Sequence, residues 1–253
     1  MKEFQSGAET AIQYESVEKI QQHFHRLYDK RDNIYLPSRE ERINLLSISI
    51  GDLTRVVFKG LPKDDQEECL ARIASRIFCI ARSVNNVSVA EGLSRKYPIE
   101  GCAYCNHMPC ICKENRPEPL VNGPRDEQRN WNLTTWQGHL NAMYGENNRK
   151  KGINFIVNRL NMERDEFISL EAEIKTKPLT IEEAECEYQL EIADTMAWTI
   201  AAANFLDINL DKAVDQRYGN GCRRCGSIPC MCGPHDLKSI TNKREREIGK
   251  LVN

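Results

Sequence analysis

The feature that most constrains the fold is a pair of cysteine clusters with identical spacing. Each follows the pattern Cys-x2-Cys-x4-Cys-x-Cys, with a glycine before the first cysteine and a proline before the third. The two clusters are Cys102, Cys105, Cys110 and Cys112, and Cys222, Cys225, Cys230 and Cys232. Every member of the second cluster lies 120 residues after its counterpart in the first. The chain of 253 residues therefore contains two tandem copies of one unit.

The cysteines are expected to bind metal rather than to form disulfides. The N-terminus is polar and lacks the apolar core of a secretory signal. The most apolar stretch, residues 195–206, is shorter than the roughly 20 residues that cross a bilayer. We therefore expect a cytoplasmic protein with no membrane association, in which thiols stay reduced. Four thiolates complete the tetrahedral coordination of zinc, so two structural zinc sites are predicted. The alternative is that each cluster is a metal-free turn of packed cysteines.

Apolar residues recur with helical periodicity before each cluster, in the same order of segments. The segments are 14–30, 38–59 and 63–84 in the first copy, and 134–145, 152–175 and 180–205 in the second. A short helix over 210–218 leads into the second cluster. Pro62 and Pro178 stand just before the third helix of each copy, and Thr180 with Glu183 forms a capping box.

No segment alternates convincingly with the period of a strand. The sequence therefore predicts an all-α fold, in which two helical units pack as a pseudo-dimer bundle and each ends in a small zinc-binding turn with four cysteines. We expect a first unit over residues 1–113, a linker over 114–130, a second unit over 131–233 and a C-terminal tail over 234–253. The linker assignment rests on the proline, glycine and charged residues of that segment.

Four carboxylates of the second copy lie on two predicted helices. Glu163 and Glu166 are three residues apart, as are Glu191 and Asp194, so each pair shares one helical face. Glutamate-rich helices are usually just solvated, but Asp194 opens an apolar run that should be buried. A carboxylate in such a place is costly unless a cation compensates it. Four oxygen ligands suit Mg²⁺ or Mn²⁺.

These acids resemble the signature of the MazG-like, all-α nucleoside triphosphate pyrophosphohydrolases. The matching pattern is Glu163-x2-Glu166, then 24 residues, then Glu191-x2-Asp194. The segment Leu190-Glu191-Ile192-Ala193-Asp194 is similar to the family's Glu-Leu-Ala-Asp core, and Tyr144-Gly145-x-x-Asn148 looks like its first helix-to-helix turn. The similarity covers residues 131–232, including the terminal cysteine cluster, which some MazG-like proteins carry.

The resemblance implies an activity and a set of site residues. Family members cleave the α–β phosphoanhydride of a nucleoside triphosphate, giving the monophosphate and pyrophosphate. By position, Glu163, Glu166, Glu191 and Asp194 would be the catalytic acids that bind Mg²⁺ or Mn²⁺. Candidates for contact with the base or the phosphates are Asn148, Lys150, Lys151 and Lys175.

The first copy has lost most of this acid set. The positions that align with the four acids hold Ser49, Asp52, Arg72 and Ser75. Because three of four ligands are missing, the first copy should not bind such a metal by itself. MazG-like units generally work as dimers, so the first copy would be an internal, degenerate partner of the second.

Two other interpretations stay open. One is a non-catalytic module that uses its zinc clusters to contact protein or nucleic acid. A net charge of -2 and clusters that are only mildly basic argue against nucleic acid as the partner. The other changes only the substrate, because related dUTPase-like enzymes share this kind of acid set. The chain is either a self-contained pseudo-dimer or pairs further as a homo-oligomer.

Overall fold

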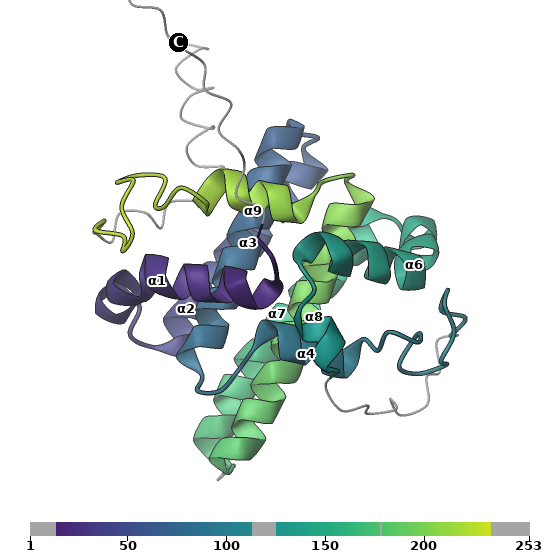
Figure 1. Ribbon diagram of the computed structural model, residues 1–253, viewed down its shortest axis with the longest axis horizontal. Helices are drawn as coiled ribbons and strands as arrows, with labels where there is room; N and C mark the ends of the chain where they lie inside the picture. Colours follow the sequence, from purple (N-terminus) through teal and green to yellow (C-terminus); the bar gives the residue numbers. More distant parts are fainter. Residues whose placement is uncertain (1–13, 113–124, 178, 234–253) are drawn as a thin grey trace, which may run out of the picture.

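The computed structural model describes residues 14–112, 125–177 and 179–233, and every regular element in these ranges is a helix (Figure 1). The first copy supplies α1 (Val17–Tyr35), α2 (Arg39–Phe58), α3 (Lys63–Ser83) and α4 (Val89–Lys96). After a single turn of helix, α5 (Asp126–Arg129), the second copy supplies α6 (Leu133–Lys151), α7 (Ile153–Thr176), α8 (Ile181–Phe205) and α9 (Leu210–Tyr218). The all-α prediction is confirmed.

Local sequence signals explain where most helices begin. Thr180 accepts a hydrogen bond from the amide of Glu183, whose side chain reaches back to the Thr180 amide, so the predicted capping box of α8 is confirmed. Ser38 and Glu41 form a second capping box at α2. Pro62 is the N-cap of α3. Three parts of the sequence prediction lie outside the described residues. They are Pro178, residues 113–124, which include most of the predicted linker, and the predicted tail.

The expected helix-to-helix turn at Tyr144–Asn148 is wrong. The helix α6 continues through these residues to Lys151, well past the predicted end at residue 145. It ends at Gly152, whose φ of 82° lies in the left-handed region that favours glycine. The residue that marks the turn is therefore Gly152, because Tyr144–Asn148 lie inside the helix.

The two copies exchange their fourth helices. Helix α4 of the first copy packs against α8 of the second copy, and α9 of the second copy packs against α3 of the first. The cysteine turns that follow are exchanged in the same way. The Cys110 amide donates to the Met143 carbonyl on α6 over 2.8 Å, and the Cys230 amide donates to the Leu27 carbonyl on α1 over 2.7 Å. The pseudo-dimer is therefore interlocked.

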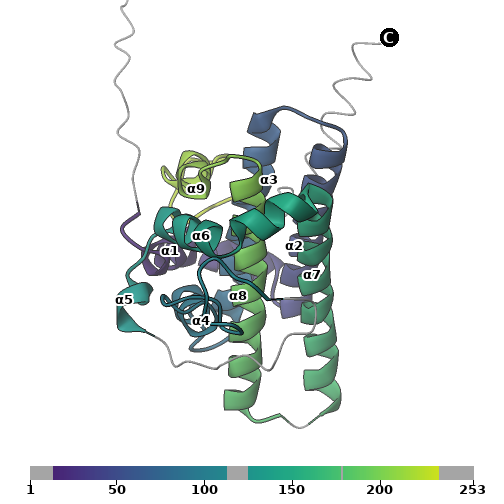
Figure 2. The same cartoon turned by 90° about the vertical axis from the view of Figure 1, so that its right-hand side faces the viewer.

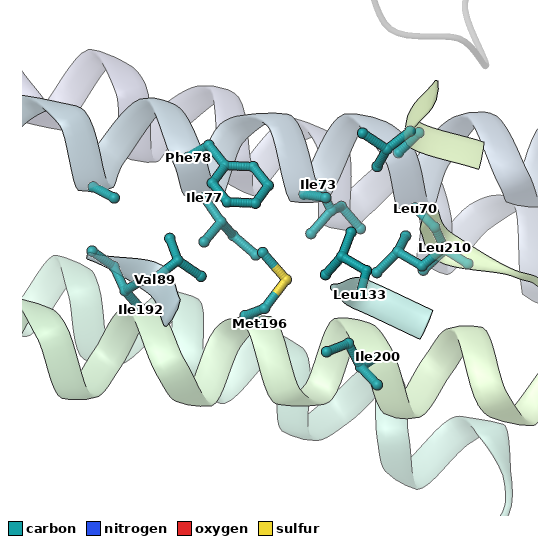
Figure 3. Close-up of a cluster of buried hydrophobic side chains, with 14 of the residues drawn as sticks. Leu70, Ile73, Ile77, Phe78, Val89, Leu133, Ile192, Met196, Ile200 and Leu210 are labelled. Atoms are coloured by element: carbon teal, nitrogen blue, oxygen red, sulfur yellow. The ribbon is translucent and has the colours of Figure 1, made fainter. Parts of the chain in front are cut away.

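One hydrophobic core joins the copies. Its centre lies between α3 and α8, where Ile73 and Ile77 face Met196 and Ile200 (Figure 3). All four side chains are fully buried. On the outer side of α8, α7 runs antiparallel to it and the two helices extend together beyond the rest of the molecule (Figure 2). This hairpin carries the acidic motif, and α4 approaches it from the first copy.

Candidate functional site

Three of the four predicted acids come together on the α7–α8 hairpin. Glu163, Glu166 and Glu191 each offer a carboxylate oxygen, and these oxygens lie within 4.8 Å of one another. Glu163 is buried, Glu191 is half-buried and Glu166 is exposed. Burial, together with the neighbouring carboxylates, raises the pKa of both Glu163 and Glu191 to about 8.

One oxygen of this cluster lacks a partner. Glu191 Oε2 is buried and accepts no hydrogen bond from the described residues. A buried, unsatisfied carboxylate oxygen is costly, and a cation between clustered carboxylates removes that cost. The donor set consists of hard oxygens, which fits a divalent cation of the Mg²⁺ or Mn²⁺ type.

The fourth acid, Asp194, is held by residues of the first copy. Its carboxylate accepts a hydrogen bond from the Tyr97 hydroxyl over 2.6 Å and forms an ion pair with Lys96. Both residues stand at the end of α4. Burial would lower the pKa of Lys96, but the charge and hydrogen bond of Asp194 raise it, so the ammonium stays charged. Burial and Asp194 together raise the pKa of Tyr97 well above its usual value.

Sequence reasoning did not find Lys96 and Tyr97 as site residues. The available signal was the tyrosine that precedes each cysteine cluster, Tyr97 in the first copy and Tyr218 in the second. The role of Tyr97 depends on the packing of α4 against α8, which brings its hydroxyl to Asp194. The site therefore contains side chains from both copies.

A cavity of about 620 Å³ opens beside Glu163 and Asp194. Its lining combines cations, aromatic rings and amides. These are Lys96, Arg149, Lys151 and Arg159; Tyr97, Tyr104, Tyr144, Phe155, Trp198 and Phe205; and Asn141, Asn147, Asn148 and Asn204. Arg159 connects the cavity to the acids, because its guanidinium lies 3.2 Å from Glu163 Oε1 and over the Trp198 ring.

The structure places the four candidate substrate contacts in different surroundings. Asn148 and Lys151 line the cavity. Lys150 does not line it and pairs with Glu146 on the surface over 2.6 Å. Lys175 also lies elsewhere and pairs with Glu40 of α2.

In the first copy an arginine stands where the second copy has Glu191. Arg72, which aligns with Glu191, contacts Asp52 with 3.0 Å between Nη1 and Oδ2, and both side chains are buried. The Ser49 hydroxyl donates to the Leu45 carbonyl within its own helix. The remnant acid is thus neutralised by the chain itself.

Two of the small residues that line the cavity correspond to larger residues in the first copy. Ala197 and Ala201 line the cavity on α8, and the aligned positions on α3 hold Phe78 and Arg82. Phe78 stacks on Phe24 with 5.4 Å between ring centroids. Arg82 pairs with buried Asp32 over 2.9 Å. The first copy therefore has large side chains at two positions where small residues line the cavity of the second copy.

Both cysteine clusters have the dimensions of a zinc site. In each, the four sulfurs lie within 4.8 Å of one another. Cys102 and Cys112 are 3.8 Å apart, Cys105 and Cys110 are 3.9 Å apart, and Cys222 and Cys232 are 3.7 Å apart. Tetrahedral zinc with bonds of about 2.3 Å separates its sulfurs by about 3.8 Å. The two clusters can each hold a zinc ion.

Comparisons with known protein families, with curated proteins and with solved structures each find no match to this chain. Among the described helices, none combines the length and the apolar character needed to cross a bilayer. What the site does must therefore be argued from its own residues.

Proposed function

We propose that this protein is a MazG-like pyrophosphohydrolase, which cleaves the α–β phosphoanhydride of a nucleoside or deoxynucleoside triphosphate with the help of Mg²⁺ or Mn²⁺. The products are the monophosphate and pyrophosphate. The observation that carries the proposal is the cluster of Glu163, Glu166 and Glu191, with the unsatisfied Glu191 oxygen, at the edge of a large cavity.

The acids would hold the metal, with Asp194 next to them on the same helix. A divalent cation in such a site neutralises phosphate charge and lowers the pKa of a bound water. Lys96 and Arg159 add positive charge beside the acids, and Lys151 adds it to the cavity lining, which favours binding of a polyphosphate. The ion pair with Lys96 also orients the Asp194 carboxylate.

The rest of the cavity suits the nucleoside. Its volume falls within the roughly 300–1,000 Å³ that is usual for small-molecule sites. Aromatic rings such as Tyr144 and Trp198 offer stacking surfaces, while Asn141 and Asn148 offer donors and acceptors to a base edge. A panel of nucleotides tests whether the site prefers dUTP, as dUTPase-like enzymes do.

The test is pyrophosphate release from a panel of NTPs and dNTPs with Mg²⁺ or Mn²⁺. We expect turnover by the wild type and a loss of at least about 100-fold in Glu191→Gln and Asp194→Asn. Glu173→Gln, an exposed change on the same hairpin, serves as the control and should retain full activity. Absence of turnover on every nucleotide, with wild type equal to Asp194→Asn, overturns the proposal.

A further inference from the structure

The first cysteine cluster forms part of the wall of the cavity. Cys110 and Cys112 line it, together with Ala103 and Tyr104, the two residues between the first pair of cysteines. This wall is anchored to α6 of the second copy. The Cys110 amide donates to the Met143 carbonyl, and the Asn147 side-chain amide donates to the Cys110 carbonyl over 2.9 Å.

Packing reinforces these hydrogen bonds. Cys102 and Cys110 form a small hydrophobic cluster with Met143, and the partly buried rings of Tyr104 and Tyr144 pack against it. Tyr104 thus lies against the small cluster through which the cysteine turn contacts α6. Its position depends on the conformation of the turn, which four zinc ligands would fix.

The second cysteine cluster provides an internal comparison. It occupies the equivalent place against α1, through the hydrogen bond from Cys230 to Leu27. The two residues between its first cysteines are Arg223 and Arg224, and Arg223 points to Glu68 of α3 over 3.3 Å. Cys222 and Cys230 belong to the main hydrophobic core. The duplication has therefore produced one cluster that borders a cavity and one that borders a packed core.

Charge indicates which part of a nucleotide would face this wall. Four thiolates outweigh the two positive charges of a zinc ion, so a loaded cluster is anionic and repels phosphate. The cations Lys96 and Arg159 stand with the acids instead. A triphosphate therefore belongs at the acids, and the uncharged nucleoside at the cysteine turn.

We propose that the first cysteine cluster is the nucleoside-binding wall of the site in the second copy, with Tyr104 as its contact residue and zinc as the ion that holds the wall in place. This inference rests on the proposed function, because it requires that the ligand is a nucleotide. It assigns the two clusters different roles: the first shapes the substrate site, and the second only stabilises the fold.

The first experiment compares Tyr104→Ala with Arg224→Ala, its counterpart in the second cluster. Binding of nucleoside monophosphates is measured by calorimetry, and KM is measured on the best triphosphate. Tyr104→Ala should weaken binding about tenfold, the loss expected for one base–aromatic contact. Arg224→Ala and Tyr104→Phe should bind as the wild type does. Binding of Mn²⁺ to the acids, followed by electron paramagnetic resonance, should be the same in all variants.

The second experiment compares Cys105→Ser with Cys225→Ser. Mass spectrometry of the metal content should show one zinc lost from each variant. Only Cys105→Ser should also lose nucleotide affinity. Wild-type affinity in Tyr104→Ala, or equal loss in the two cysteine variants, overturns the inference while leaving the proposed function intact. A wild type that binds monophosphates but releases no pyrophosphate overturns the proposed function alone, and one that binds no nucleotide overturns both.

Discussion

At the scale of single residues, the two copies differ in the cation that balances their carboxylates. Asp52 is paired with Arg72, a part of the chain, in a buried contact. Glu191, at the position equivalent to Arg72, instead adds a further carboxyl group to a cluster of acids. An arginine in place of an acid thus forms an internal ion pair in the first copy, where the second copy has a cluster of carboxylates that could hold a metal ion.

The variant Arg72→Met should destabilise the protein by about 3 kcal/mol, because it leaves the buried Asp52 without its principal cation. Urea unfolding followed by circular dichroism measures the change. Lys150→Met, which removes an exposed ion pair, is the control and should change stability by less than about 0.5 kcal/mol. Equal midpoints for the two variants would contradict the role assigned to Arg72.

The acid cluster makes stability depend on pH in a defined direction. Glu163 and Glu191 have a pKa of about 8 in the folded protein and near 4.5 when unfolded. Between these values the folded state binds more protons, so the free energy of unfolding falls as pH rises. Thermal melting without added Mg²⁺ or Mn²⁺ should therefore show a lower Tm at about pH 8 than at about pH 5.

One added ion and one substitution should each weaken this dependence of Tm on pH. Mn²⁺ should restore the Tm at the higher pH, because the cation replaces the protons between the carboxylates. Glu191→Gln should flatten the profile without metal, because it removes one of the two groups with a raised pKa. A Tm that rises with pH in the wild type would show that the acids do not lie as described.

At the scale of elements, the short helix α4 brings side chains of the first copy to the acids of the second. It carries Lys96 and Tyr97 to Asp194. Its approach to α8 depends on Gly92, where an added Cβ would lie 2.6 Å from the Gln189 carbonyl oxygen and 3.3 Å from the Ala193 Cβ. The absence of a side chain at this position therefore sets how closely Lys96 reaches the site.

Gly92→Ala should push α4 away from α8, lower kcat/KM and destabilise the protein by about 1–3 kcal/mol, the usual cost of overpacking. Gly138→Ala is the matched control, since no atom lies within 4 Å of an added Cβ there. It should keep full activity and gain up to about 1 kcal/mol from helix propensity. Steady-state kinetics and chemical unfolding of both variants check this prediction. Unchanged kinetics in Gly92→Ala would contradict the role of α4.

At the scale of the whole molecule, the exchange of α4 and α9 creates one core from two copies. Residues 131–233 alone would leave α8 without α3 and α4, and would leave α9 without its packing surface on α3. We expect this segment to form dimers or aggregates rather than a folded monomer, because large apolar faces would be exposed. Size-exclusion chromatography with light scattering measures the oligomeric state of this segment. A monomer that unfolds cooperatively would contradict the interlocked arrangement.

The sequence alone determined the features that depend on local spacing. The cysteine pattern predicted two compact four-cysteine turns, and the spacing of three residues placed Glu163 with Glu166 on one helical face. Helical periodicity gave most helices of both copies to within a few residues. It missed α4 and also α5, which lies inside the predicted linker, because eight and four residues are too few for a period to emerge.

Only the tertiary structure decided which elements meet. It placed Lys96 and Tyr97 of one copy against Asp194 of the other, and the first cysteine cluster beside the cavity of the second copy. It also separated Lys151, which lines the cavity, from its neighbour Lys150. The physical reason is that local spacing fixes which side chains share a helical face. The packing of α4 on α8 and of α9 on α3 determines which side chains of the other copy contact that face.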